Sequence, residues 1–527
     1  MKSLEREKVK QGVGGKLFNF RPALFFALFC ALGVSCAYAF KTDGKFLFLT
    51  ICCLLLIPVS LFLSGKKSFF VGILLLAFFA LGISVCFSQM ERYDNPFVAG
   101  RYETTGKIVD GTAVGDYVVF TLEELTLDGE NTDGIMLAYF DREQAEKIRI
   151  GDKIIFVGEI TPYETANDAF SHGYVADGVR FNAYRIDEFA RLPSSPDLFQ
   201  RLRLALKERL YAGMSNESAA FVCAVLTGDT SGIESGLLTN VRLGGVAHIF
   251  AVSGLHIGAL YAFCRLITDK TAIKKSPRII QFLFVAFVLI FYGGICRYTS
   301  SVLRAVSMCL TSYAMRLFGV KSDALERIGV AMLLCLVISP ASLFTAGFLL
   351  SFGASFGICA FSRTLFDLFS GWFYKDKERP RAGTGLCGFF AAAISAQTFT
   401  APLCLHFFGY VSFWGLFLNS VFVPLLTATF SLLLALGWVC CLLPIGVSSA
   451  VLSALSTAIS GLLLLFHAVD FSFALFVGVK VPLSAFICYY SGLAFSSDKI
   501  NLKKGGKIAV ATIFFVVFLA VMIWTNL

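Results

Sequence analysis

The sequence predicts a multi-pass α-helical membrane protein with a small β-barrel domain inserted between two groups of helices. Three observations carry this prediction: 57% of the 527 residues are hydrophobic, only 15% are charged, and the mean hydropathy is +0.74. A water-soluble chain of this length needs far more polar surface, and a disordered chain has the opposite composition. A transmembrane β-barrel carries alternating strands instead of the long apolar runs found here. Helices that cross a bilayer are therefore the predicted class.

Charge is distributed unevenly along the chain, although the formal total is only +9. Residues 90–200 contain 21 acidic and 10 basic residues and no cysteine, whereas the remainder contains 35 basic and 15 acidic residues and all 16 cysteines. The acidic block is also the longest stretch without an apolar run of spanning length. We therefore expect a soluble domain at 90–195, between two membrane parts.

The first membrane part, residues 22–89, is predicted to contain three helices. Their apolar runs lie at about 22–40, 46–64 and 68–88, each near the length that a bilayer requires. A basic tail at 1–21 precedes them, and basic residues next to a span favour the cytoplasmic side. We therefore expect a cytoplasmic N-terminus and an extracytoplasmic soluble domain.

The second membrane part is predicted at 231–495. Residues 196–230 form amphipathic segments that we expect at the membrane interface, and residues 496–527 form a basic loop and a last helix. The apolar runs after residue 200 are at about 216–228, 246–267, 279–296, 300–319, 326–340, 343–363, 385–409, 411–443, 448–468, 474–494 and 508–525.

Basic loops set the predicted topology of this part. The loops at 270–278, 375–381 and 499–507 all lie in the cytoplasm if the run at 216–228 does not span. The run at 411–443, which contains Pro424, must then be a broken or re-entrant helix. This arrangement gives about thirteen spans of roughly 20 residues.

The soluble domain contains five strand candidates, at about 101–110, 116–127, 134–140, 152–160 and 179–187. Residues 117–122 show the alternation and β-branched content of a strand, and turn pairs such as Asp128-Gly129 separate the candidates. Five short strands suit an OB-like barrel. OB-folds bind nucleic acid through basic and aromatic surfaces, but this domain is acidic, so binding of a protein or organisation of a complex stays open as its role.

Residues 248–258 read His-Ile-Phe-Ala-Val-Ser-Gly-Leu-His-Ile-Gly. His248 and His256 lie about 80° apart around a helix and are poorly placed to share a metal ion. Ser253 lacks the sequence context of a strained nucleophile elbow. Gly254 and Gly258 have the spacing that permits close packing of helices.

This stretch resembles the signature of the ComEC competence-protein family, the DNA-uptake channels of bacterial transformation. Other segments resemble the family in the same order: 226–229, 301–308, 347–352 with Leu349 in place of the usual Gln, 397–403 and 419–424. Residues 167–178 resemble the end of its N-terminal domain, although Asn167-Asp168-Ala169 replaces the usual Asn-Pro-Gly. The resemblance covers about residues 20–495. It implies a channel in the bacterial cytoplasmic membrane that carries single-stranded DNA into the cytoplasm.

The sequence also departs from the family pattern. Many members continue into a metallo-β-lactamase-like domain with a His-x-His-x-Asp-His motif, which is absent here, so the chain resembles a short form. We therefore expect no nuclease activity, no other enzymatic activity and no cofactor or metal. No Walker A sequence is present, so transport would draw energy from a partner or an ion gradient. The resemblance implies a DNA receptor, a cytoplasmic helicase-like ATPase and a separate nuclease as partners.

A polyanion needs a hydrated, electropositive path through a bilayer, so polar residues within the apolar runs are the candidates for the DNA path. The candidates are His248, Ser253, Gly254, His256, Arg297, Arg304, Gln397, His406 and Asn419. Each also has a structural interpretation. Arg304 can pair with a buried acid or a helix end, Arg297 can anchor an interface, and the two amides can bond to neighbouring helices.

Two other functions stay open from the sequence. A secondary transporter of a small anionic solute, with an extracellular β-domain, would use helices broken near Pro402 and Pro424. It would also favour inverted internal repeats, which are not evident. A membrane-embedded hydrolase would use His248, Ser253 or His256.

Overall fold

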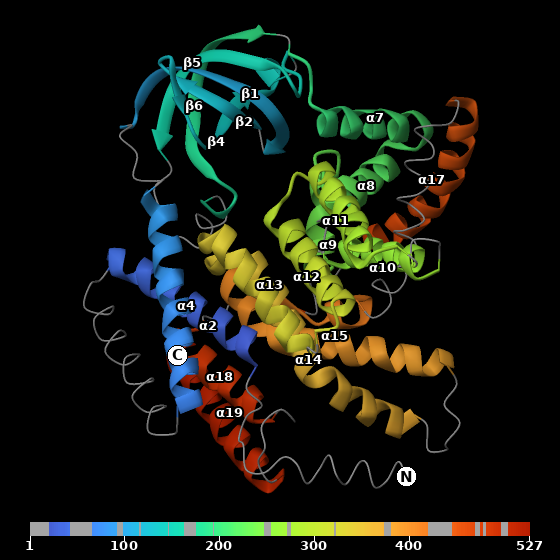
Figure 1. Ribbon diagram of the computed structural model, residues 1–527. Coiled ribbons are helices and arrows are strands. Elements are labelled where there is room, and N and C mark those ends of the chain that lie inside the picture. The colour runs from blue at the N-terminus through green and yellow to red at the C-terminus, as the bar shows by residue number, and fades with distance from the viewer. Residues whose placement is uncertain are drawn as a thin grey trace.

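A β-barrel lies against one end of a block of helices in the computed structural model (Figure 1). The structure describes residues 21–42, 66–91, 98–114, 117–145, 147–162, 175–192, 194–246, 254–270, 274, 276–320, 323–373, 381–419, 445–468, 475–477, 481–496 and 504–526. The predicted helix at 46–64 and the break expected at Pro424 lie outside these residues.

The soluble domain is a closed barrel of five strands. The strands are β1 (Gly100–Val114), β2 (Tyr117–Leu127), β4 (Ile135–Asp141), β5 (Lys153–Pro162) and β6 (Val179–Leu192). Pairing in the order β1-β2-β4-β6-β5 returns to β1, and only the β4–β6 pair is parallel. This closure confirms the expected β-barrel and fits an OB-fold. The alternation of apolar and polar residues and the turn residues between strands predicted the strands, because one face of every strand must be buried.

A short strand that the sequence did not predict extends one hairpin of the barrel. β3 (Glu130–Thr132) pairs with the end of β2. The two linking residues, Asp128 and Gly129, have φ angles of +48° and +84°. Two consecutive positive φ angles are typical of the tight turn whose twist matches an antiparallel pair.

The interior of the barrel is filled by side chains. Phe140, Phe156 and Phe181 are fully buried there, and the ring of Phe140 meets the edges of Phe120 and Phe156. A small barrel filled in this way has no lumen. Any ligand of this domain therefore binds on its outer surface or where it meets the helices.

The described helices are α2 (Pro22–Thr42), α4 (Lys66–Glu91), α5 (Arg142–Ala145), α7 (Leu198–Gly213), α8 (Asn216–Thr227), α9 (Ser235–Leu243), α10 (Gly254–Lys270), α11 (Arg278–Ile295), α12 (Ser300–Leu317), α13 (Ala324–Ile338), η3 (Pro340–Phe344), α14 (Ala346–Phe373), α15 (Arg381–Phe408), α17 (Ile445–Ala468), α18 (Leu483–Ser496) and α19 (Lys504–Asn526). Two predicted apolar runs begin as short paired strands, β7 (Tyr410–Ser412) and β8 (Leu475–Val477).

Four described helices are long and apolar enough to cross a membrane: Phe70–Glu91, Arg278–Ile295, Ala346–Ser370 and Cys387–Phe408. The chain is therefore a helical membrane protein with a β domain. The predicted number of about thirteen spans is not confirmed by the described residues. Several apolar runs form helices too short to cross alone, such as α8 with 12 residues and α18 with 14.

Glycines bring the N-terminal helices into backbone contact. A Cβ on Gly82 of α4 would overlap the carbonyl oxygen of Cys30 in α2, and a Cβ on Gly33 would overlap that of Phe79. On another side of α2, a Cβ on Gly329 of α13 would overlap the backbone of Leu24. Small residues allow such close approach, which replaces the hydrophobic drive that lipid does not provide.

α15 continues through Pro402 without the break that the sequence suggested for this position. A proline has no N–H, so the carbonyl four residues earlier, that of Thr398, loses its helical partner. The Tyr489 hydroxyl of α18 donates to this carbonyl at 2.7 Å, and the Tyr490 hydroxyl donates to the carbonyl of Phe399 at 2.7 Å. The neighbouring helix thus supplies the hydrogen bond that the proline removes.

We expect Gly82→Ala to lower the free energy of unfolding by about 1–3 kcal/mol, because the added methyl group forces α2 and α4 apart. Thermal unfolding of the purified protein in detergent measures this change. Gly461→Ala in α17 is the matched control, since nothing lies within 4 Å of a Cβ there. Equal unfolding temperatures for the two variants would contradict the close contact.

We expect Tyr489→Phe to cost about 1–3 kcal/mol of unfolding free energy, because the Thr398 carbonyl is left unsatisfied. Pro402→Ala restores the N–H group that this carbonyl lacks. In that background, Tyr489→Phe should therefore cost much less. A double-mutant cycle of chemical unfolding in detergent measures the difference, and equal costs in both backgrounds would refute the assignment.

Candidate functional site

Three segments of the helical block hold the barrel. The buried side chain of Gln200 in α7 donates to the Ile108 carbonyl of β1 at 3.5 Å. Arg297, in the turn between α11 and α12, forms an ion pair with Asp110 of β1. The Ser339 hydroxyl, after α13, donates to the Ala176 carbonyl before β6 at 3.2 Å.

A cavity of about 400 Å³ is lined by the residues of two of these contacts, Asp110–Arg297 and Ser339–Ala176. Strands β1, β2 and β4 and the segment before β6 form its barrel side. The α11–α12 turn, α12 and the end of α13 form its helical side. The acidic and basic side chains on the wall are Asp110, Glu123, Asp177, Arg297 and Arg304. Two arginines and three carboxylates thus meet where the two parts of the protein join.

The carboxylate of Asp177 is solvent-accessible but crowded by the cavity wall. Loss of hydration there raises the pKa of Asp177 to about 6, against the attraction of Arg304, which lowers it. Arg304 is itself only 3% exposed. Its guanidinium lies against Gly347 of α14, where a Cβ would come within 3.1 Å of Nη2. Two segments that resemble the family, 301–308 and 347–352, therefore meet at this arginine.

The backbone aims Arg297 at the barrel. Arg297 and Tyr298 have φ angles of +61° and +46°, a left-handed conformation that costs free energy in residues other than glycine. Their N–H groups donate to the carbonyls of Gly294 at 3.1 Å and Gly293 at 2.9 Å. Arg203 of α7 donates to the carbonyls of Gly294 and Ile295, at 3.4 and 3.3 Å. A cation at these carbonyls stabilises the C-terminal end of α11.

Asp110 also lies at an irregular point of the backbone. The register between β1 and β2 shifts between Ile108 and Asp110. Such bulges re-aim a side chain and occur next to functional sites. Both members of the ion pair therefore sit at departures from regular structure.

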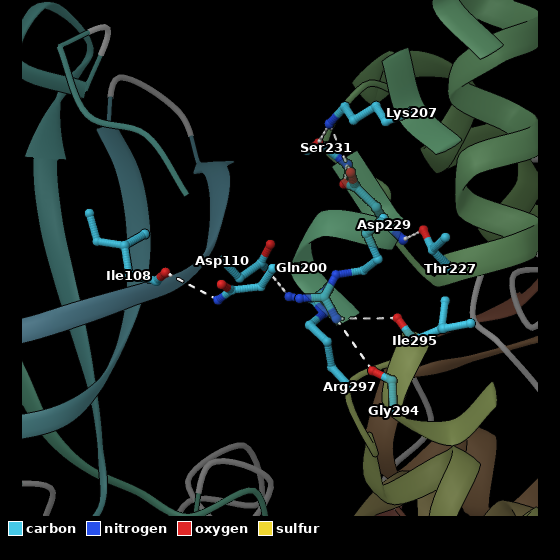
Figure 2. A network of polar contacts seen from close by, with 11 residues as sticks. Ile108, Asp110, Gln200, Lys207, Thr227, Asp229, Ser231, Gly294, Ile295 and Arg297 are labelled. Atoms are coloured by element: carbon cyan, nitrogen blue, oxygen red, sulfur yellow. Dashed lines mark hydrogen bonds and ion pairs between the residues drawn. The ribbon is translucent and has the colours of Figure 1, made fainter. Parts of the chain in front are cut away.

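A second polar network lies near this ion pair, between α7 and the end of α8 (Figure 2). Lys207 of α7 pairs with Asp229 at 2.8 Å, and the backbone N–H of Ser231 donates to the same carboxylate at 3.0 Å. Gly228 ends α8 in a left-handed conformation at φ +80°, a common way to end a helix. The segment 226–229 thus turns the chain so that Asp229 faces α7.

A smaller cavity, of about 40 Å³, lies beside this network. Its wall includes Arg203, Lys207 and Asp229, and also Asp110 and Arg297. The Asp110–Arg297 pair therefore borders both cavities.

The predicted site residues fall into separate groups. Arg297 and Arg304 line the same cavity. Gly254 begins α10, next to Ala305 of α12, and His256 is buried on the same helix. His248 and Ser253 lie outside the described residues.

Gln397 and Asn419 belong to another junction. Gln397 of α15 donates to the Ser412 carbonyl of β7 at 2.8 Å. Asn419 donates to the Gly245 carbonyl after α9 at 3.4 Å. Both amides thus bond to backbone at helix and strand ends. His406 packs edge-on against the rings of Phe407 and Phe486.

Sequence reasoning missed Asp110, Asp177, Gln200, Arg203 and Lys207. One signal was available for α7: Asp197 and Gln200 form a reciprocal capping box, with bonds of 2.7 and 2.9 Å, and this spacing is readable from sequence. The spacing of Gln200, Arg203 and Lys207 also places them on one face of a helix. Nothing local marked Asp110 or Asp177, because their partners are distant in sequence.

Comparisons with known proteins support one family. The Competence protein family model matches residues 225–503. ComE operon protein 3 of Bacillus subtilis (strain 168) is 27% identical over 270 residues, which cover 50% of this chain and 31% of that relative. No solved structure matches the chain.

The family match begins at the end of α8 and includes α12, the Arg304–Gly347 contact and the junction of Gln397 and Asn419. It extends over more than half of the sequence. The chain therefore belongs to the Competence protein family.

Proposed function

We propose that this protein forms the passage through which single-stranded DNA crosses the bacterial cytoplasmic membrane during natural transformation. Family membership over residues 225–503 carries the proposal. The likeness to a competence-operon protein adds support, although the chain matches less than a third of that relative.

The physical requirement for this function is a hydrated path that tolerates a polyanion. The cavity between the barrel and the helices has a largely apolar wall that carries charged side chains, including Arg297 and Arg304. In the proposed orientation the N-terminus is cytoplasmic and the barrel is extracytoplasmic, because basic residues precede α2 and favour the inner side. The cavity is then the outer vestibule of the path.

The proposed passage has no nuclease or other enzymatic activity and no cofactor. Degradation of the strand that is not transported then requires a partner, and transport draws its energy from a partner or an ion gradient. A DNA receptor outside, a helicase-like ATPase inside and a separate nuclease are the proposed partners.

We expect Arg304→Ala to reduce the arrival of labelled DNA in the cytoplasm by about tenfold or more. Loss of a charge contact worth about 1.5–3 kcal/mol produces such an effect. The measurement is uptake of fluorescent DNA by a deletion strain that expresses each variant at equal abundance in the membrane. The matched control is Arg316→Ala, on the same helix, where an exposed arginine pairs with Asp269 at 3.0 Å.

The deletion strain itself tests the function. Arrival of labelled DNA at the wild-type level without the protein would contradict the proposal. Equal losses of uptake for Arg304→Ala and Arg316→Ala would be compatible with a role of the protein in DNA uptake. They would contradict the proposal that the DNA passes through the cavity.

A further inference from the structure

The Asp110–Arg297 ion pair lies where a ligand could replace one of its two partners. Both of its members line the larger and the smaller cavity. The side chains are 26% exposed for Arg297 and 19% for Asp110. The pair is thus desolvated enough to be strong and open enough for a ligand to reach it.

The backbone maintains this pair at a cost. Arg297 has a positive φ angle, and Asp110 follows a register shift in β1. Non-glycine residues persist in such conformations where the surroundings impose them, and they cluster at ligand sites and switches. Arg203 fixes the carbonyls just before Arg297, so the guanidinium has a prearranged place.

A guanidinium recognises a carboxylate and a phosphate with the same planar fork of N–H donors. A carboxylate held against an arginine therefore occupies the place that a phosphodiester oxygen pair would take. Two hydroxyl groups line the same cavity on its helical side and can donate to phosphate, those of Thr299 and Ser307.

We propose that Arg297 binds a phosphodiester of the transported strand and that Asp110 occupies this place when no strand is present. This inference rests on the proposed function and adds the residue that contacts the strand at the vestibule. Asp110 returns to Arg297 when a phosphate leaves, so the arginine is not left as an unpaired buried charge.

The remaining charges of the cavity agree with a site of transit. Glu123 and Asp177 lie on the same wall, and their repulsion weakens the binding of any anion. A conduction path requires binding that is favourable enough for entry and weak enough for exit. The two carboxylates keep a strand from resting at Arg297.

The experiment measures binding of a fluorescent 20-nucleotide poly-dT strand to the full chain in nanodiscs of phosphatidylcholine, which adds no anionic headgroup. If Asp110 occupies Arg297 for about nine-tenths of the time, Asp110→Asn should lower the Kd about tenfold. The slope of log K against log salt should steepen by about 0.7, as for one more phosphate contact on a single strand. Arg297→Gln should weaken binding, and the double variant should equal Arg297→Gln.

Two controls separate this effect from general electrostatics and from misfolding. Asp269→Asn removes one negative charge from an exposed ion pair outside the cavity and should leave the Kd unchanged. A poly-dT strand with an uncharged methylphosphonate backbone should bind Asp110→Asn and wild type equally. Thermal unfolding in the same nanodiscs checks that each variant is folded.

An unchanged or higher Kd for folded Asp110→Asn would overturn the inference, as would additive effects of the two substitutions or an equal gain with the uncharged strand. These results do not depend on uptake in cells. Uptake that persists in the deletion strain refutes the function, whereas failure of the Asp110–Arg297 coupling refutes only this site.

Discussion

A hydrocarbon solvent offers no hydrogen bonds, and this constraint determines how the helical block is built. Every place where a helix ends or loses an N–H needs a partner from elsewhere in the protein. Tyr489 meets this need at Pro402, and Arg203 meets it at the end of α11. At the end of α8, the Tyr292 hydroxyl donates to the Leu226 carbonyl at 2.7 Å. The polar side chains of the apolar helices therefore mark the irregular points of the backbone.

The same constraint explains why one of the contacts with the barrel is an ion pair. The turn between α11 and α12 presents the Arg297 guanidinium to the barrel, which offers it the carboxylate of Asp110. The acidic composition of the barrel domain thus has a counterpart in the basic remainder of the chain. The sequence contains an acidic block and a basic remainder. In the fold, these opposite charges attract each other where the barrel meets the helices.

Prediction from sequence succeeded where structure follows a local period. The five barrel strands and α11 were located to within a few residues, because alternation and apolar length report which face or segment is buried. The count of spans was harder, since an apolar run such as 216–228 forms a helix buried among others. The composition of an apolar segment alone does not tell whether its helix is surrounded by protein or by lipid.

The candidate site was predictable only in part, for a related reason. Arg297 and Arg304 are conspicuous because arginine is costly in an apolar run. Gln397 and Asn419 were selected for the same reason, as polar residues in apolar runs. In the structure, however, their amides donate hydrogen bonds to backbone carbonyls. Asp110 is one of many carboxylates in an acidic domain, and its role depends on a bulge and on a turn far along the chain. Such pairings belong to tertiary structure and leave no local pattern.

The position of the barrel in the sequence determines the order in which the parts of the protein fold and assemble during synthesis. Asp110 leaves the ribosome about 190 residues before Arg297, which at about 5–20 residues per second is a delay of roughly 10–40 s. The barrel closes through its own strand pairs and core. It can therefore fold in this interval, before the segment that contains Arg297 has been synthesised. α2 likewise waits for α13, whose Asp323 accepts from Arg21 at 2.5 Å. The wall of the cavity is completed only when these late helices arrive, so a defect there would arise at docking, after each part has folded.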